Sequence, residues 1–147
     1  MQPLVKATAS GRSQSDGPQQ VTDLGATEAN QALVTEFAEK VLKGGDFSVF
    51  TNYVSTASYQ QHDPEAADGL DGWGAAVATW AEAGKQLSYR TIQIIAEGDF
   101  VLLQSEADFG VPVWYYDLFR VQDGTIVEHW DVIAPVPGTL PHGNGLF

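Results

Sequence analysis

The sequence predicts an α+β fold, with helices in the first half of the chain and an antiparallel sheet in the second. Two segments before residue 84 repeat their apolar residues at helical spacing. Four later segments are rich in β-branched and aromatic residues and are separated by glycine-containing turns. Because helices come first and strands follow consecutively, we expect a curved sheet around the helices, with a cavity between the two layers.

The first helix is expected to begin at Thr27, as its N-cap, and to end at Gly44-Gly45. Its apolar residues share one face: Leu33, Val34, Phe37, Ala38, Val41 and Leu42. Asp46 can cap a short helical piece from Phe47 to Tyr53.

An extended segment from Ser58 to Asp63 follows, because Pro64 disfavours helix in the residue before it. After a loop rich in Gly and Asp, a further helix is predicted to stop at Gly84. One face of this helix is marked by Trp73, Val77, Trp80 and Ala81.

Four strands complete the predicted domain. They are expected over Gln86–Ala96, Phe100–Phe109, Pro112–Val121 and Thr125–Ile133. Residues 1–24 are polar and lack apolar periodicity, so we expect a flexible N-terminal tail followed by one domain over 25–147.

Composition narrows the functional classes. The 147 residues include 19 acidic and 7 basic side chains, a net charge of −12, which argues against nucleic acid and anionic membranes as partners. The chain has no Cys, so disulfides and thiol catalysis are excluded. Its start lacks the apolar stretch of a secretory signal, so we expect a cytoplasmic protein.

The hairpin from Tyr115 to Val132 is the most informative segment. If residues 122–124 form a three-residue loop with Gly124 left-handed, Asp117 faces His129 and Tyr115 faces Asp131. Alternation then places these four side chains and Phe119 on one face of the sheet. Two carboxylates and an imidazole are costly to bury in an ordinary core, so they indicate a pocket for proton chemistry.

Two alternatives remain open at this point. A two-residue turn would shift the pairing by one and place Glu128 and Trp130 beside Asp117. The second alternative is that His129 and Asp131 lie on the solvated face of the sheet as a surface ion pair. The three-residue loop is favoured because glycine at its last position suits the bulge geometry.

Several motifs resemble the SnoaL-like polyketide cyclase family of the nuclear-transport-factor-2-like superfamily. The resemblance covers roughly residues 27–147 and rests on the pieces Tyr59–Pro64 (YQQHDP), Asp68-Gly69, Glu97–Val101, Asp117–Val121, Ile126–Val132, Pro135–Pro137 and Asn144–Phe147. It implies a conical α+β barrel, with helices packed in a curved sheet of four to six strands and a pocket in its concave face. It also implies a homodimer that needs no metal and no organic cofactor.

The expected function is that of a lyase or isomerase acting on a small oxygenated carbonyl compound. His129 would move the proton because imidazole titrates near neutrality, and Asp131 would orient it. By the resemblance, Asp117 matches the pocket carboxyl that donates to an oxyanion in isomerases of the superfamily. A structural hydrogen bond, or a pair with Arg120, is the alternative for Asp117. His62 is a catalytic candidate at the pocket rim, with a solvated loop histidine as its alternative.

The candidate substrate-binding residues are Tyr59, Trp73, Gln104, Tyr115 and Phe119. Gln104 marks a departure, because similar proteins often carry His on the strand that corresponds to Leu102–Glu106. The other functional hypotheses are a non-catalytic small-molecule-binding or dimerisation module, and hydrolysis resembling that of an epoxide hydrolase. A metal held by His62, His129 and Asp131 is the weaker alternative, so we predict no metal site.

Overall fold

The apolar stripe that begins at Leu33 forms one continuous helical segment in the computed structural model, which describes residues 20–82, 88–108 and 110–147. A 3-10 turn, Leu24–Ala26, leads into α1, Thr27–Phe37, and a π-helical stretch, Ala38–Lys43, completes the segment. The predicted N-cap role of Thr27 is wrong, because Thr27 is already helical. Its hydroxyl donates to Leu24 O at 2.8 Å and accepts from Gly98 N at 2.8 Å.

The predictions for the segments from Asp46 to Gly84 are confirmed in part. Asp46 caps the 3-10 helix Phe47–Asn52 by accepting from Ser48 N at 3.2 Å, as predicted. Of the predicted extended segment, only Gln60–Gln61 is a strand, β1. The helix α2 spans Gly69–Glu82, and its predicted end at Gly84 lies outside the described residues.

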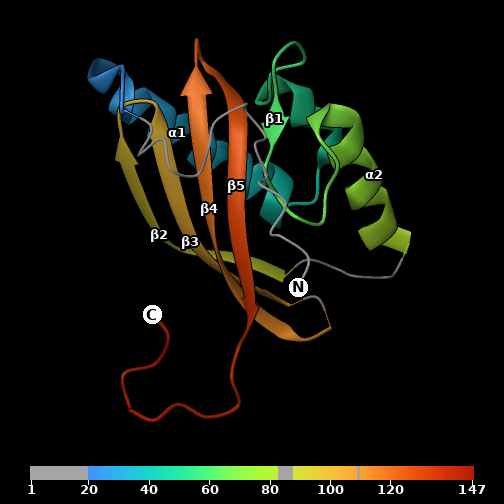
Figure 1. The fold of residues 1–147 in the computed structure, drawn as a ribbon, viewed down its shortest axis with the longest axis vertical. Helices are drawn as coiled ribbons and strands as arrows, with labels where there is room; N and C mark the ends of the chain where they lie inside the picture. The colour runs from blue at the N-terminus through green and yellow to red at the C-terminus, as the bar shows by residue number, and fades with distance from the viewer. Residues whose placement is uncertain (1–19, 83–87, 109) are drawn as a thin grey trace, which may run out of the picture.

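All four predicted strands are present, although the predicted start at Gln86 and the predicted end at Phe109 lie outside the described residues. They are β2, Ser88–Glu97; β3, Phe100–Asp108; β4, Pro112–Gln122; and β5, Thr125–Pro135. With β1 they form one curved, unclosed sheet in the order β1-β5-β4-β3-β2 (Figure 1). β1 runs parallel to β5, and the other neighbours are antiparallel. The α+β cone fold with helices on the sheet is therefore confirmed.

The turn between β4 and β5 differs from the prediction. Asp123 and Gly124 form a two-residue turn with φ of 51° and 75°, as a type I′ hairpin requires. A bulge at Val127 then adds one residue to β5, so that Asp117 pairs with Asp131, Phe119 with His129 and Tyr115 with Ile133. The predicted pairing is thus wrong by two residues, but a shift of two leaves every side chain on its expected face.

The core lies between the helical segment and the concave face of the sheet. Burial alternates along β3, where Val101, Leu103, Ser105 and Ala107 are buried. Phe37 of α1 reaches this layer and packs edge-on against Phe119, with ring centroids 5.7 Å apart. Each such buried side chain contributes about 1.5–3 kcal/mol to folding. No helix in the described part of the chain is long and apolar enough to span a membrane.

Part of the predicted tail is attached to the sheet. Thr22 N donates to Asp99 Oδ1 at 2.8 Å, and Asp99 N donates to Thr22 O at 2.9 Å. A Cβ on Gly98 would meet Thr22 O at 2.0 Å, so this turn requires glycine. Residues 1–19 lie outside the described residues, and the division into tail and domain stays a prediction.

Candidate active site

A cavity of about 40 Å³ lies between the helices and the concave face of the sheet. β2 contributes Tyr89, β4 contributes Tyr115 and Asp117, and β5 contributes His129, Asp131 and Ile133. The remaining wall is formed by Leu42, Phe47, Asp63 and Trp73. Most of the lining is apolar, so the three carboxyls and the imidazole face a largely apolar space.

His129 is held at both ring nitrogens and is 2% exposed. Nδ1 lies 2.9 Å from Gln61 Oε1, and Nε2 lies 2.9 Å from Asp117 Oδ1. Phe119 stacks on the ring at a centroid distance of 4.6 Å, and Trp73 meets it edge-on at 5.8 Å. The ring therefore has little freedom to turn toward a substrate.

Asp117 connects His129 to a chain of hydroxyl groups. Its Oδ2 accepts from Tyr89 OH at 3.3 Å, and Tyr89 OH accepts from Ser105 Oγ at 2.8 Å. Burial, and next the Asp117 carboxyl, raise the pKa of the Tyr89 phenol. The same two causes raise the pKa of Tyr115, so both phenols keep their protons near neutral pH.

Asp131 differs from the other two carboxyls because no group among the described residues hydrogen-bonds its side chain. Burial is the main cause that raises its pKa from 3.8 to about 7. The charge on His129 lowers the pKa, and the charges on Asp63 and Asp117 raise it. Asp117 stands directly opposite on β4, so two carboxylates would repel each other across the strands. Asp131 is therefore a cavity carboxyl that gains and loses its proton near neutral pH.

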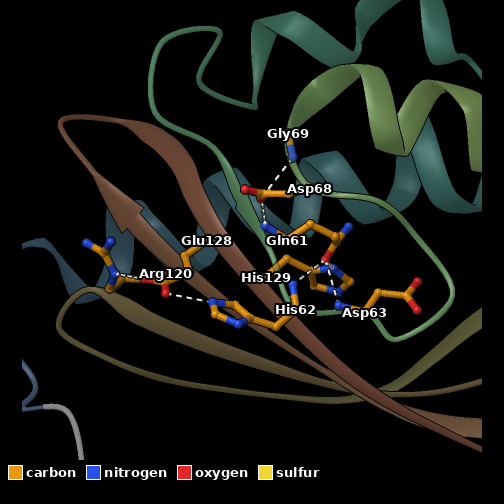
Figure 2. Close-up of polar contacts among 8 residues, drawn as sticks. All are labelled: Gln61, His62, Asp63, Asp68, Gly69, Arg120, Glu128 and His129. Carbon is orange, nitrogen blue, oxygen red and sulfur yellow. Dashed lines mark hydrogen bonds and ion pairs between the residues drawn. The ribbon is translucent and has the colours of Figure 1, made fainter. Parts of the chain in front are cut away.

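His62 lies on the other side of β5, away from the cavity. Its Nε2 is 2.8 Å from Glu128 Oε1, and Glu128 Oε2 accepts from Arg120 Nε at 2.8 Å (Figure 2). Trp130 stacks on the His62 ring at 4.7 Å. The prediction of His62 as a pocket residue is wrong, because Gln61 takes the inward position of β1 and His62 follows it outward.

Three of the predicted substrate-binding residues also lie outside the cavity wall. The hydroxyl of Tyr59 accepts from Gln61 Nε2 at 2.9 Å, which places Tyr59 behind Gln61. Gln104 lies on the outer face and donates to Tyr116 OH at 3.2 Å. Phe119 belongs to the core and reaches the site only through its stack on His129. Trp73 and Tyr115 line the cavity, as do His129, Asp117 and Asp131.

Gln61, Asp63 and Tyr89 are site residues that the sequence analysis missed. Gln61 and Asp63 flank His62 in the YQQHDP segment, and alternation about β1 was the signal that would have selected Gln61. Tyr89 lies on β2 and pairs with Ala107 of β3, outside the β4–β5 hairpin, so the pattern of that hairpin did not indicate Tyr89 as a site residue.

The structure also shows which side chains lie close enough together to bind one metal ion. The metal alternative is wrong as stated, because His62 is separated from His129 and Asp131. Asp117, His129 and Asp131 instead have ligand-type atoms within 4.8 Å of one another. Arg120 points to the outer face toward Glu128, as strand alternation predicts, and the described lining of the cavity contains no arginine that could pair with an aspartate as in an epoxide hydrolase.

A wider hollow of about 590 Å³ shares the residue Tyr89 with the cavity. Tyr89 lines both spaces, and the hollow is further lined by Lys43, Arg90, Glu106 and Val113. Arg90 is paired with Glu106 at 2.7 Å, and the lining also holds Lys43 and Asp108, so the charges of these four side chains balance. Tyr89 thus contacts both a narrow inner space and a wide outer one.

Comparisons with known proteins identify the fold and the family. The chain resembles IdmH from Streptomyces antibioticus, a candidate polyketide cyclase, at 20% identity and a TM-score of 0.57, over 71% of this chain and 91% of that one. It resembles an NTF2-like protein of unknown function from Cytophaga hutchinsonii at 16% identity and a TM-score of 0.60, over 81% and 96%. A candidate ketosteroid isomerase from Kribbella flavida matches at 14% identity and a TM-score of 0.62, over 83% and 90%.

These similarities establish the cone-shaped fold alone. No curated protein sequence matches the chain. The sequence profile of the SnoaL-like domain matches residues 34–129, which include the end of α1, then α2, β1 and the strands β2 to β5 as far as His129. The chain therefore belongs to the SnoaL-like domain family.

Proposed function

We propose that the protein is a lyase or isomerase that moves a proton next to a carbonyl group without an organic cofactor or metal. One observation carries the proposal. The Asp131 carboxyl faces an apolar cavity, its pKa is raised to about 7, and the His129–Asp117 pair lies beside it. A carboxyl of this kind is matched to proton transfer at neutral pH.

In this reaction, Asp131 is the base and His129 is not. Both ring nitrogens of His129 are engaged, by Gln61 and by Asp117, whereas the Asp131 carboxyl faces the cavity without a hydrogen-bond partner among the described residues. The Asp131 carboxylate takes the hydrogen from the carbon next to the carbonyl, and the electron pair moves onto the carbonyl oxygen. The Tyr115 phenol keeps its proton and lines the same cavity, so it is the donor that we assign to this oxyanion.

The outcome depends on what the enolate does next. Return of the proton from Asp131 to a conjugated carbon gives an isomerisation. Expulsion of a hydroxyl two carbons away, with a proton supplied by the His129–Asp117 pair, gives a dehydration. Attack of the enolate carbon on a second carbonyl forms a carbon–carbon bond and an alkoxide, which takes the proton held by Asp131 and completes an aldol cyclisation. All three need the same first step, and that step is the proposed function.

The two spaces indicate the shape of the substrate. A cavity of about 40 Å³ admits only a small end such as a carbonyl and its neighbouring carbon, whereas the wider hollow of about 590 Å³ can hold a larger body. Substitution of Tyr89, which lines both spaces, therefore tests the arrangement. Tyr89→Ala should raise affinity for bulky β-dicarbonyl compounds, and Tyr89→Phe, which retains the ring, should not.

The test is exchange of the acidic hydrogens of β-dicarbonyl compounds in D₂O, followed by NMR. Wild-type protein should accelerate this exchange, Asp131→Asn should abolish the acceleration, and the matched control Asp123→Asn, in the exposed turn, should retain it. Equal exchange by wild type and Asp131→Asn would contradict the proposal. Compounds that exchange should also raise the melting temperature of the wild-type protein.

A binding function without chemistry is the second candidate, and the small inner cavity favours it. If a ligand occupies only the outer hollow, the inner carboxyls contribute nothing to binding. Stabilisation by a ligand that is equal in wild type and Asp131→Asn, with no exchange in either, would identify this function.

We also propose a homodimer formed through the outer face of the sheet. Val132 is 71% exposed and Ile95 55% exposed on this face, and Trp114 and Tyr116 lie between them in the meander. Exposed apolar side chains in such number indicate a contact surface. Light scattering at micromolar concentration should give twice the mass of the chain, and Val132→Glu should reduce it to that of a monomer. A monomeric wild type would contradict this proposal.

A further inference from the structure

Gln61 stands at the centre of a set of hydrogen bonds that joins β1 to β5 and to the loop before α2. It is the inward-facing residue of β1, 6% exposed, and pairs with His129 on β5. Its backbone N–H donates to Asp68 Oδ1 at 2.9 Å, which fixes this short strand against the loop before α2 (Figure 2). The side chain therefore enters the site from an anchored position.

The orientation of the Gln61 amide is determined by its neighbours. The backbone N–H groups of His62 and Asp63 both point to the same side-chain atom, each at 3.1 Å. A backbone N–H can only donate, so this atom is the oxygen and not the nitrogen. On the other side, Nε2 donates to the Tyr59 hydroxyl at 2.9 Å, which completes the assignment.

The fixed oxygen determines where His129 carries its proton. His129 Nδ1 lies 2.9 Å from Gln61 Oε1, an atom that can only accept, so Nδ1 must hold a hydrogen. On the opposite side, Nε2 lies 2.9 Å from Asp117 Oδ1, and one further proton must lie between these two atoms. A neutral ring protonated only at Nε2 would set two lone pairs against each other at Gln61.

We infer that Gln61 is a positioning residue that sets the protonation of His129. With an acceptor on each side, the ring either is an imidazolium beside the Asp117 carboxylate or shares one proton with it. Both states keep the pair neutral as a whole and ready to release a proton from the Nε2–Asp117 side. The imidazolium form also places positive charge near Asp131, which favours the carboxylate form of that side chain.

The catalytic consequence of this inference rests on the proposed function, but the protonation state does not. Wild-type protein labelled with ¹⁵N in histidine has three His residues, and the exposed His142→Ala and the variant His129→Gln assign their signals. At pH 7 the Nδ1 of His129 should have the chemical shift of a protonated nitrogen. An unprotonated Nδ1 in the wild type would overturn the inference without any variant.

Gln61→Leu should remove the acceptor and convert His129 to the form that is protonated only at Nε2. Gln61→Glu restores an oxygen at the same place and should restore the signal of the protonated Nδ1. Tyr59→Phe is the matched control, because it changes the contact on the donor side of Gln61 and leaves Oε1 in place. Loss of the protonated Nδ1 in Tyr59→Phe, or its retention in Gln61→Leu, would show that Gln61 has only a structural role.

Where a substrate is found, Gln61→Leu should lower kcat at least about tenfold with little change in KM, as expected for a group that acts through another. Gln61→Glu should recover part of that loss. If the ¹⁵N result holds and no substrate turns over, the proposed function fails while the assignment of Gln61 stands. A Gln61→Leu variant with altered protonation and unchanged kcat would remove Gln61 from the mechanism.

Discussion

Replacement of Asp131 by Asn should stabilise the protein at neutral and alkaline pH. In the folded protein the pKa of Asp131 is raised from 3.8 to about 7. Such a carboxyl costs stability once it ionises, because the folded state holds its proton more tightly than the unfolded chain. The sign is therefore opposite to that of an ion-paired aspartate: the penalty is absent below pH 4, grows between pH 4 and 7, and is constant above that.

The size of this effect follows from the two pKa values. A difference between 3.8 and about 7 corresponds to at most about 4 kcal/mol, at about 1.4 kcal/mol per pKa unit. Because Asp131 is only half-buried, solvent screening reduces this to about 1–2 kcal/mol. For a chain of this length, that is a rise of about 3–8 °C in melting temperature.

The assay is thermal unfolding of wild type and Asp131→Asn from pH 4.5 to pH 8.5. The variant should gain in melting temperature as the pH rises and keep a constant advantage above pH 7.5. Asp123→Asn, the same substitution in the exposed β4–β5 turn, should track the wild type throughout. An advantage that is independent of pH, or one that grows toward acid pH, would refute the assigned environment of Asp131.

The remaining predictions concern the scaffold. Arg120→Leu should lower the free energy of unfolding in urea by about 2–4 kcal/mol, because it leaves the buried Glu128 carboxylate with His62 alone. Arg90→Leu, whose partner Glu106 is exposed, should lower it by less than about 1 kcal/mol. Equal losses in the two variants would contradict the stabilising role of the buried pair. Deleting residues 1–19 should change the melting temperature little, whereas deleting residues 1–24 should lower it through loss of the Thr22–Asp99 hydrogen bonds. Equal melting temperatures for the two deletions would show that these hydrogen bonds do not stabilise the fold.

The sequence was sufficient for the architecture because the strongest signals were local. The alternation of apolar and polar residues in β3 and β4 and the apolar stripe of α1 each select one face, and those faces meet in the core. Glycine at position 124 located the hairpin turn. The faces of Asp117, His129 and Asp131 were predicted correctly even though their pairing was not, since the error was an even number of residues.

What could not be predicted depends on contacts between distant segments. The bulge at Val127 arises where β5 is also bound by residues 53–55 and by β1, through bonds such as Ile126 N to Tyr53 O at 2.7 Å. No pattern within the hairpin encodes these bonds. The same is true of Gln61, whose role depends on a two-residue strand, and of Tyr89, which reaches Asp117 from two strands away.

The pH dependence of deuterium exchange into a β-dicarbonyl substrate tests the assignment of Asp131 as the base most directly. With Asp131 as the base, kcat/KM for exchange should rise with pH and level off above an inflection near 7. This inflection gives the pKa of Asp131 in the free enzyme. Asp131→Asn should lose both the rate and the inflection. An inflection near 7 that persists in Asp131→Asn, or a wild-type rate that falls as the pH rises through 7, would contradict proton removal by Asp131.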